Sequence, residues 1–231
     1  MKLPHPLIPG TLIRRYKRFL ADIELDDGII VTAHCANTGS MSQVSSPGSR
    51  VMISSAANPN RKTRYDWQLI MVNGRWAGIN TAVPNRLLRE GFETGVITEF
   101  EPYDSIRTEV AYGTGSRVDA LLGGTEGLMY VEAKNVTLVE NGCALFPDAV
   151  TARGAKHLDE LIHVVEAGQK AAMFFLSQRM DADCLGPAAH VDPTYASKLK
   201  AAVSAGVSVI AWRALITERE IILDRPLPFI F

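Results

Sequence analysis

Three residues in the second half of the chain have the types and spacing that metal-assisted phosphodiester chemistry needs. Glu132 and Lys134 are two apart in the run Leu-Met-Tyr-Val-Glu-Ala-Lys, and strand alternation places both side chains on one face. Asp119 lies on the preceding run, and a four-residue loop at 124–127 would set it directly across from Glu132, with Cβ atoms about 5 Å apart. The three side chains are therefore expected to share one site.

Two neighbouring carboxylates repel each other unless a cation lies beside them. A divalent metal ion held by Asp119 and Glu132 would relieve that repulsion, and oxygen ligands suit Mg²⁺ or Mn²⁺. Such an ion could position and acidify a water for attack on a phosphodiester, with Lys134 orienting the water or stabilising the developing charge. The competing interpretation is an exposed ion pair of Glu132 and Lys134 with Asp119 incidental to it, because an Asp...Glu-x-Lys string also arises by chance.

The elements around this site follow the order of a nuclease core. Leu87 and Leu88 fit one face of a helix that opens near Pro84 and stops at Gly95. Three strands, a helix, a strand, a second helix and two final strands are expected after it, at 106–112, 117–122, 128–136, 153–167, 171–177, 193–203, 207–216 and 221–223. Helix, three strands, helix and strand is also the core order of the restriction-endonuclease-like, or PD-(D/E)xK, fold. Residues 84–231 are therefore expected to form an α/β domain of that type.

The first 83 residues have the pattern of a small β-barrel. Short alternating or β-branched runs are expected as strands at 19–24, 28–35, 50–54, 64–72 and 75–80. Turn residues separate them, and Asn73-Gly74 is a strong signal for a two-residue hairpin. Five short strands in such a segment favour a closed or part-closed barrel of the oligonucleotide-binding (OB) type.

Two clusters in the expected barrel mix cations with aromatic residues. They are Arg14, Arg15, Tyr16, Lys17 and Arg18, and then Arg61, Lys62 and Arg64 with the neighbouring Tyr65 and Trp67. This combination can follow a phosphate backbone while it offers planes for base stacking. Residues 1–85 hold ten Lys or Arg against five Asp or Glu, a net charge of +5, whereas the remainder carries −6. Nucleic acid, expected to be DNA bound without strong sequence preference, suits such a segment; a solvated basic strand edge is the alternative.

The remaining composition sets the broad class of protein. A chain of 231 residues with 47% hydrophobic and 21% charged residues can form one large or two small globular domains. Neither a signal peptide nor an apolar run of membrane-spanning length is visible, so a soluble, cytoplasmic protein with no membrane partner is expected. Cys35, Cys143 and Cys184 are far apart and odd in number, which predicts reduced thiols, and the scattered histidines predict no zinc site.

Several sequence blocks spread over nearly the whole chain resemble one known family. They include Arg-Arg-Tyr-Lys-Arg-Phe-Leu-Ala-Asp, Thr-Ala-His-Cys-Ala-Asn-Thr-Gly-Ser-Met, Val-Glu-Ala-Lys-Asn-Val-Thr-Leu and Phe-Pro-Asp-Ala-Val-Thr-Ala-Arg-Gly-Ala-Lys-His-Leu. These blocks are similar to the sugar fermentation stimulation protein A family, described as DNA-binding, with an N-terminal oligonucleotide-type barrel and a C-terminal domain similar to PD-(D/E)xK nucleases. The resemblance implies that Asp119, Glu132 and Lys134 form the nuclease motif, with Val118 in place of its proline and Glu90 as a further carboxylate.

Other residues and functions compete with this account. Asp148 supplies a literal Pro-Asp, but it follows the Glu-x-Lys strand and is expected to cap or line a loop. Arg153, Lys156 and His157 open a helix and could meet a phosphate, or they could form a solvated face. A non-catalytic DNA-binding regulator and a small-molecule binding module of carbohydrate metabolism are the alternative functions. The sequence has no nucleotide-binding glycine loop and no nucleophile elbow.

Overall fold

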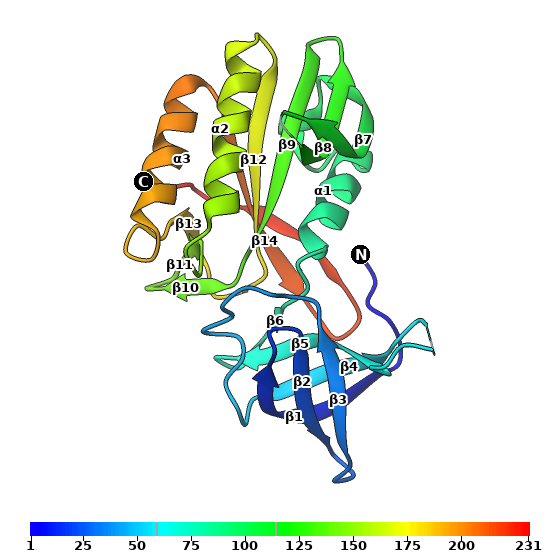
Figure 1. The fold of residues 1–231 in the computed structure, drawn as a ribbon. Helices are drawn as coiled ribbons and strands as arrows, with labels where there is room; N and C mark the ends of the chain where they lie inside the picture. The colour runs from blue at the N-terminus through cyan, green and yellow to red at the C-terminus, as the bar shows by residue number, and fades with distance from the viewer. Residues whose placement is uncertain (59, 114) are drawn as a thin grey trace.

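The protein folds into two domains stacked end to end, with the barrel below and the larger α/β domain above in Figure 1. The coordinates are a computed structural model that describes residues 1–58, 60–113 and 115–231. The last strand of the barrel domain ends at Gly78, and the first helix begins at Val83. The first residues of the chain cross to the larger domain, where Lys2 forms a β-bridge with Glu220.

Five strands form a closed barrel, with a sixth as an added hairpin partner. They are β1 (Leu7–Tyr16), β2 (Leu20–Leu25), β3 (Ile30–Cys35), β4 (Arg50–Ser55), β5 (Tyr65–Val72) and β6 (Arg75–Gly78). Antiparallel ladders join β1 to β2, β2 to β3, β1 to β4 and β4 to β5, and a parallel ladder between β3 and β5 closes the circle. This connectivity is that of an oligonucleotide-type barrel, which confirms the fold predicted for this part of the chain.

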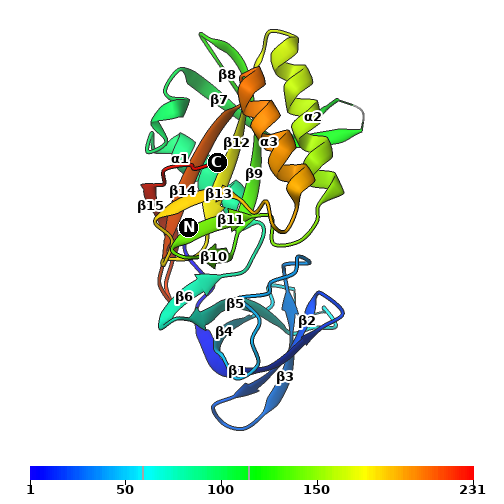
Figure 2. The ribbon, with the colours of Figure 1, turned by 90° about the vertical axis from the view of Figure 1, so that its left-hand side faces the viewer.

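The larger domain is a six-stranded sheet between helices. Its strands lie in the order β15 (Ile221–Pro226), β14 (Ser208–Ile216), β12 (Lys170–Ser177), β9 (Gly127–Val136), β8 (Ser116–Gly124) and β7 (Tyr103–Tyr112). Helix α1 (Val83–Glu93) covers one face, and α2 (Ala152–Glu166) and α3 (Pro193–Ala205) cover the other, as Figures 1 and 2 show; the 3₁₀ turn η1 (Thr98–Phe100) links α1 to β7. The predicted order of the helices and of the strands in this sheet is confirmed, and with it the α/β class of the domain.

Local sequence signals fix the ends of the helices. Thr151 and Asp192 cap α2 and α3, because each side chain accepts a hydrogen bond from a backbone N–H of the first turn; such a cap contributes about 1 kcal/mol. Pro193 opens α3 at a position where an N–H would have no helical partner. Gly206 ends α3 with φ at 109°, a left-handed conformation that glycine adopts without a Cβ penalty. No helix in the described ranges has the length and apolar character needed to cross a membrane.

A small three-stranded sheet lies beside the large one. β10 (Leu138–Glu140) pairs antiparallel with β11 (Cys143–Phe146), and β11 pairs parallel with β13 (Cys184–Pro187). Cys143 lies opposite Cys184 in the second ladder, with Cα atoms 4.6 Å apart, and the two cysteines form a disulfide. The expectation of three reduced thiols is therefore wrong for this pair. The two cysteines are 41 residues apart in the sequence, and only the pairing of β11 with β13 brings them together.

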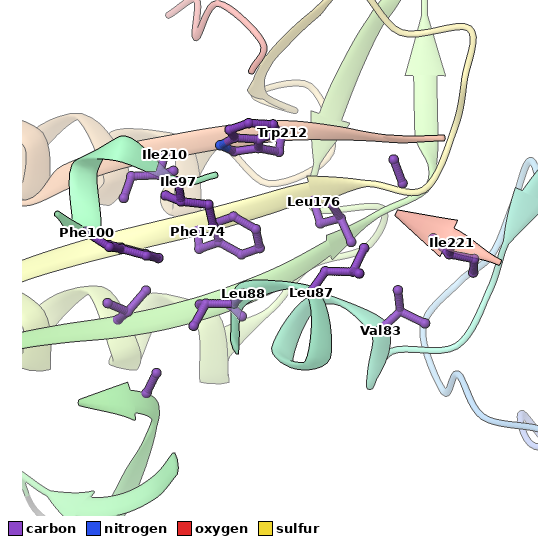
Figure 3. Close-up of a cluster of buried hydrophobic side chains, with 14 of the residues drawn as sticks. Val83, Leu87, Leu88, Ile97, Phe100, Phe174, Leu176, Ile210, Trp212 and Ile221 are labelled. Carbon is purple, nitrogen blue, oxygen red and sulfur yellow. The ribbon is translucent and has the colours of Figure 1, made fainter. Parts of the chain in front are cut away.

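The core beneath α1 fixes how that helix lies on the sheet. Leu87 and Leu88 of α1 share one buried cluster with Phe174 of β12 and Trp212 of β14, which Figure 3 shows. Phe174 and Leu87 are fully buried, and burying one such side chain contributes about 1.5–3 kcal/mol. This packing also sets the face of α1 that points to the sheet, and with it the position of Asn85.

Hydrogen bonds and a shared apolar core hold the two domains together. The backbone N–H of Gly78 donates to the carbonyl oxygen of Gln178 over 3.2 Å. Arg179 is 3% exposed and donates to Oε1 of Gln43 in the barrel, also over 3.2 Å. Met52 of the barrel belongs to the buried cluster under α1. The barrel and the sheet therefore have a fixed relative position.

Candidate functional site

Asp119 and Glu132 lie opposite each other where β8 and β9 separate. The antiparallel ladder has the register that the sequence predicts, and it ends at the pair Ala120 and Val131. One residue further along, Asp119 Oδ2 accepts a hydrogen bond from the backbone N–H of Ala133 over 2.8 Å. The Asp119 carboxylate thus accepts the hydrogen bond that a backbone carbonyl would accept if the ladder continued. This bond holds the carboxylate where β8 and β9 separate.

Glu132 is 3% exposed and has two nitrogen partners. Lys134 Nζ donates to Glu132 Oε1 over 2.5 Å, and Nδ1 of His157 contacts the same oxygen. Burial raises the pKa of Glu132, but the hydrogen bond from His157 and the charge of Lys134 outweigh it, so the pKa lies below its ordinary value. Oε2 of Glu132 makes no hydrogen bond within the described residues. The side chain is an ionised carboxylate with one buried oxygen that has no hydrogen-bond partner in the described residues.

Asp119 shows the opposite shift. Burial and the nearby charge of Glu132 raise the pKa of Asp119 above its ordinary value, although the hydrogen bonds from Ala133 and Asn85 oppose the rise. Asn85 is on α1, and its Nδ2 donates to Asp119 Oδ1 over 2.7 Å. The repulsion expected for these two carboxylates is therefore present in the folded protein.

Both carboxylates line a cavity of about 490 Å³. Its wall combines three acids, four groups that are or can become cationic, and two small residues: Glu109, Asp119, Glu132, Arg117, Arg153, Lys156, His157, Gly115 and Ser116. Lys134 contacts Glu132 but is not part of this wall. Acids that can hold a cation and cations that can hold a phosphate thus line one cavity that opens to solvent.

A divalent ion in this cavity would depend on few protein ligands. No group of three or more His, Cys, Asp or Glu side chains in the described part of the chain is arranged to hold a metal ion. Mg²⁺ commonly binds through one or two carboxylates and keeps several waters. Asp119 and Glu132, whose buried Oε2 has no hydrogen-bond partner in the described residues, fit that pattern, and water would complete the coordination.

Glu90 lies away from the cavity that Asp119 and Glu132 line. The residue of α1 that reaches Asp119 is Asn85. Glu90 Oε2 is 2.7 Å from the N-terminal ammonium of Met1, and this side chain lines a different pocket, next to β15. Residues five apart on a helix point in different directions, so Asn85 and Glu90 cannot both reach Asp119. The spacing of Asn85 three residues before the buried Leu88 was the signal that could have identified it.

The start of α2 reaches the site, which agrees with the interpretation that Arg153, Lys156 and His157 could meet a phosphate. His157 contacts Glu132 as described, and Arg153 Nε lies 3.4 Å from His157 Nε2. Lys156 also lines the cavity and contacts Ser116 Oγ at 3.3 Å. The direct contact of a helix residue with Glu132 was not predicted. Nothing in a single sequence sets the angle at which α2 crosses β9.

Several of the expected phosphate-binding cations in the barrel are occupied by protein partners. Arg14 Nε donates to Asp22 over 2.9 Å, and its guanidinium lies 5.0 Å from the centre of the Tyr16 ring. Arg61 pairs with Asp66 at 3.0 Å. The expected cations that form no ion pair within the described ranges, apart from Arg15, are Lys17, Arg18, Lys62 and Arg64.

Arg15 organises a loop. Its guanidinium donates to the carbonyl oxygens of Asn37 and Gly39, both over 2.9 Å, and to those of Ser40 and Arg18. The same loop meets the larger domain, where Asp148 Oδ2 accepts a hydrogen bond from the backbone N–H of Met41 over 2.8 Å. Asp148, expected to cap or line the loop before Arg153, binds this loop of the barrel, and Arg15 supports the same joint between the domains.

A closed oligonucleotide-type barrel joined to an α/β domain with an Asp...Glu-x-Lys cavity defines the class, a two-domain protein with a restriction-endonuclease-like second part. The chain belongs to the sugar fermentation stimulation protein family. The model described as "Sugar fermentation stimulation protein RE domain" matches residues 82–220, and the one described as "SfsA N-terminal OB domain" matches residues 13–79.

Similar proteins cover the whole chain. Sugar fermentation stimulation protein homologs of Geobacter sulfurreducens and Citrifermentans bemidjiense are 57% and 54% identical over 228 residues, which is 99% of this chain and 98% and 99% of theirs. The solved structure of Pyrococcus furiosus SfsA in complex with Ca²⁺ matches with a TM-score of 0.91 at 29% identity and covers 100% of both chains. The two-domain architecture is therefore shared along the full length.

Proposed function

We propose that this protein is a DNA-binding phosphodiesterase that depends on Mg²⁺ or Mn²⁺. The observation that carries this proposal is the placement of Asp119 and Glu132 in one cavity with Glu132 Oε2 left without a partner. The Ca²⁺ bound to the related Pyrococcus furiosus protein supports a role for a divalent cation. A link to the regulation of sugar metabolism rests on the family name alone.

The residues of the cavity divide the work of the reaction. A divalent cation, when bound, supplies a Lewis acid and a water of lowered pKa at neutral pH. Asp119, fixed by Ala133 and Asn85, and Glu132 would hold that cation. Lys134 orients the attacking water or offsets the charge that develops on the phosphate. Arg117 and Arg153 line the same wall and can neutralise phosphate oxygens.

The barrel binds the nucleic acid through its remaining cations. Lys17 and Arg18 form the turn between β1 and β2, and Lys62 and Arg64 precede β5. Contacts of this kind are mainly electrostatic and independent of sequence. Binding and chemistry are therefore assigned to different domains, which makes them separable by mutation.

Cleavage assays on purified protein test this proposal. Single- and double-stranded DNA of several sequences, incubated with Mn²⁺, should be cut by the wild type, and Asp119→Asn and Lys134→Ala should each lower the rate at least about 100-fold. DNA affinity should remain close to wild type in both variants. Glu90→Gln is the matched control, because Glu90 lies outside the cavity and should keep wild-type cleavage.

Two results would remove the proposal. Cleavage that survives in both Asp119→Asn and Lys134→Ala would place the reaction at another site or in a contaminant. DNA binding with no cleavage at any Mg²⁺ or Mn²⁺ concentration would favour the non-catalytic DNA-binding regulator.

A further inference from the structure

A third carboxylate lies in register with Asp119 and Glu132. On the outer side of β8, the ladder with β7 pairs Thr108 with Ala120 and Val110 with Val118, which sets Glu109 opposite Asp119. On the inner side, Asp119 lies opposite Glu132, one step beyond the last pair of the ladder with β9. Glu109, Asp119 and Glu132 thus form one row across three neighbouring strands, and all three line the same cavity.

Along the β7–β8 hairpin, the side chains switch from one face of the sheet to the other at this row. Ala120 packs in the core beneath α1, whereas Val118, two residues away on the same strand, packs in the core beneath α2. A regular strand would keep both side chains on one face. Glu109 has φ at +54°, a left-handed conformation that costs a non-glycine residue about 1–3 kcal/mol. The reversal at Glu109 and Asp119 places this row on the wall of the cavity.

The cavity also holds a buried acceptor without a partner. Glu132 is 3% exposed, and its Oε2 makes no hydrogen bond within the described residues, although Oε1 has both Lys134 and His157. A buried carboxylate oxygen with no partner is costly in a folded protein. A bound cation would provide what it lacks.

The Glu109 side chain lines the cavity and would have to turn toward that oxygen to share an ion with Asp119 and Glu132, because no three such side chains in the described residues are placed to hold one. It is solvent-exposed, and its carboxylate makes no ion pair or hydrogen bond in the described part of the chain; only its backbone carbonyl is engaged, by Arg117 over 2.9 Å. Two protein carboxylates leave a divalent ion dependent on water for most of its coordination. A third carboxylate, from β7, would add another negatively charged ligand on the same side of the ion.

We propose that Glu109 is the third carboxylate of this centre and binds the divalent cation, directly or through one of its waters, when that cation joins Asp119 and Glu132. The inference rests on the proposed function, because it presumes a cation in this cavity. It assigns to β7 a ligand that the Asp...Glu-x-Lys motif does not contain.

Calorimetric titration of the full-length protein with Ca²⁺ and with Mn²⁺, without DNA, tests this assignment. Glu109→Gln should weaken the affinity about tenfold, because affinity follows the number of charged ligands. Asp104→Asn is the matched control, since it removes one charge from an exposed position on the same strand outside the cavity, and it should stay within about twofold of wild type. Glu109→Asp keeps the charge but shortens the side chain, so it should also weaken binding. Circular dichroism verifies that each variant is folded.

The outcomes separate this inference from the proposed function. If Asp119→Asn abolishes binding while Glu109→Gln binds like the wild type, the assignment of Glu109 is overturned and the proposed centre stands. If Glu109→Asp binds the ions with full wild-type affinity, the length of the side chain does not matter. The negative charge then acts only at a distance, and Glu109 is not a ligand. If the wild type binds neither ion, both this inference and the metal dependence of the proposed function are wrong.

Discussion

Asp119 and Glu132 show how one pair of strands gives two carboxylates different acidities. Glu132 lies between Lys134 and His157, which hold its pKa below the ordinary value despite burial. Asp119 is half-buried and, within the described residues, accepts from the neutral donors Asn85 and Ala133, so desolvation and the charge of Glu132 raise its pKa. In the absence of metal, the ionised form of Asp119 therefore destabilises the folded protein.

Replacing Asp119 with asparagine should stabilise the protein without metal. A raised pKa means that the folded state favours the neutral acid, so at neutral pH the ionised group lowers stability, and Asp119→Asn removes that effect. The amide keeps an oxygen for the Ala133 N–H, and Asn85 can turn its own amide to match. We expect the Tm of Asp119→Asn to lie about 3 °C above that of the wild type, measured by thermal denaturation in EDTA.

Mn²⁺ provides the control for this residue. It should raise the Tm of the wild type by mass action and leave Asp119→Asn unchanged. An asparagine variant that is less stable in EDTA, or one that gains as much from Mn²⁺ as the wild type, would show that the carboxylate is structural.

The sequence predicted the residues that act through strand spacing and missed those that act through tertiary contact. Glu132 and Lys134 share a face because strand alternation requires it, and the short loop set Asp119 across from Glu132. Asn85 and Glu109 reach the site only because α1 crosses the sheet and β7 reverses its facing. Neither the crossing nor the reversal leaves a periodic signal in the chain.

Among the elements, the turn from β1 to β2 and the loop after β3 depend on one arginine. Arg15 donates to four backbone carbonyl oxygens, including those of Asn37 and Gly39. Arg18 lies in the same turn, but its side chain makes no ion pair within the described residues. Arg15 and Arg18 thus have different roles, one structural and one exposed, although the sequence alone does not tell which is which.

Arg15→Ala and Arg18→Ala should therefore have different effects. Arg15→Ala leaves several carbonyl oxygens without a donor and should lower the free energy of unfolding by about 2 kcal/mol, measured by urea denaturation. Arg18→Ala should change stability by less than about 0.5 kcal/mol but reduce the salt dependence of DNA binding by about one counterion, measured by fluorescence anisotropy. Equal losses of stability, or an unchanged salt dependence in Arg18→Ala, would contradict this division of roles.

Many elements with strong local signals were predicted, but the ten-residue strand β1 and the very short strands were not. The Asn73-Gly74 turn joins β5 to β6 as a two-residue hairpin, since Val72 pairs with Arg75. β10 and β13 have three and four residues, too few to show a period, and they exist because β11 pairs with both. The disulfide between Cys143 and Cys184 was missed for the same reason.

At the scale of the whole molecule, a polar network links the barrel to the sheet. Arg179 donates to Asp181 over 2.6 Å, and Asn73 of the barrel donates to the same carboxylate over 3.0 Å. Burial raises the pKa of Asp181, but the hydrogen bonds from Arg179 and Asn73 and the charge of Arg179 outweigh it, and the pKa lies below its ordinary value. Protonation of one residue should therefore weaken the joint between the domains.

This network predicts an acid-sensitive joint. A folded pKa below the unfolded value of 3.8 means that Asp181 contributes its stability above that value and loses it as the pH falls through the lower, folded pKa. Asp181→Asn should lower stability at pH 7 and flatten its decline below about pH 4, measured by denaturant unfolding across pH. Parallel pH curves for the wild type and the variant would rule out the linkage.

One divalent cation is proposed to join Asp119 to Glu132 in the cavity between β8, β9 and α2. An anomalous difference map from crystals of the protein grown with Mn²⁺ and a short DNA tests this binding directly. We expect a manganese peak about 2 Å from a carboxylate oxygen of each residue, and no such peak in Asp119→Asn. A map at saturating Mn²⁺ without a peak in this cavity, or with DNA phosphates far from it, would show that the cation does not bind there as proposed.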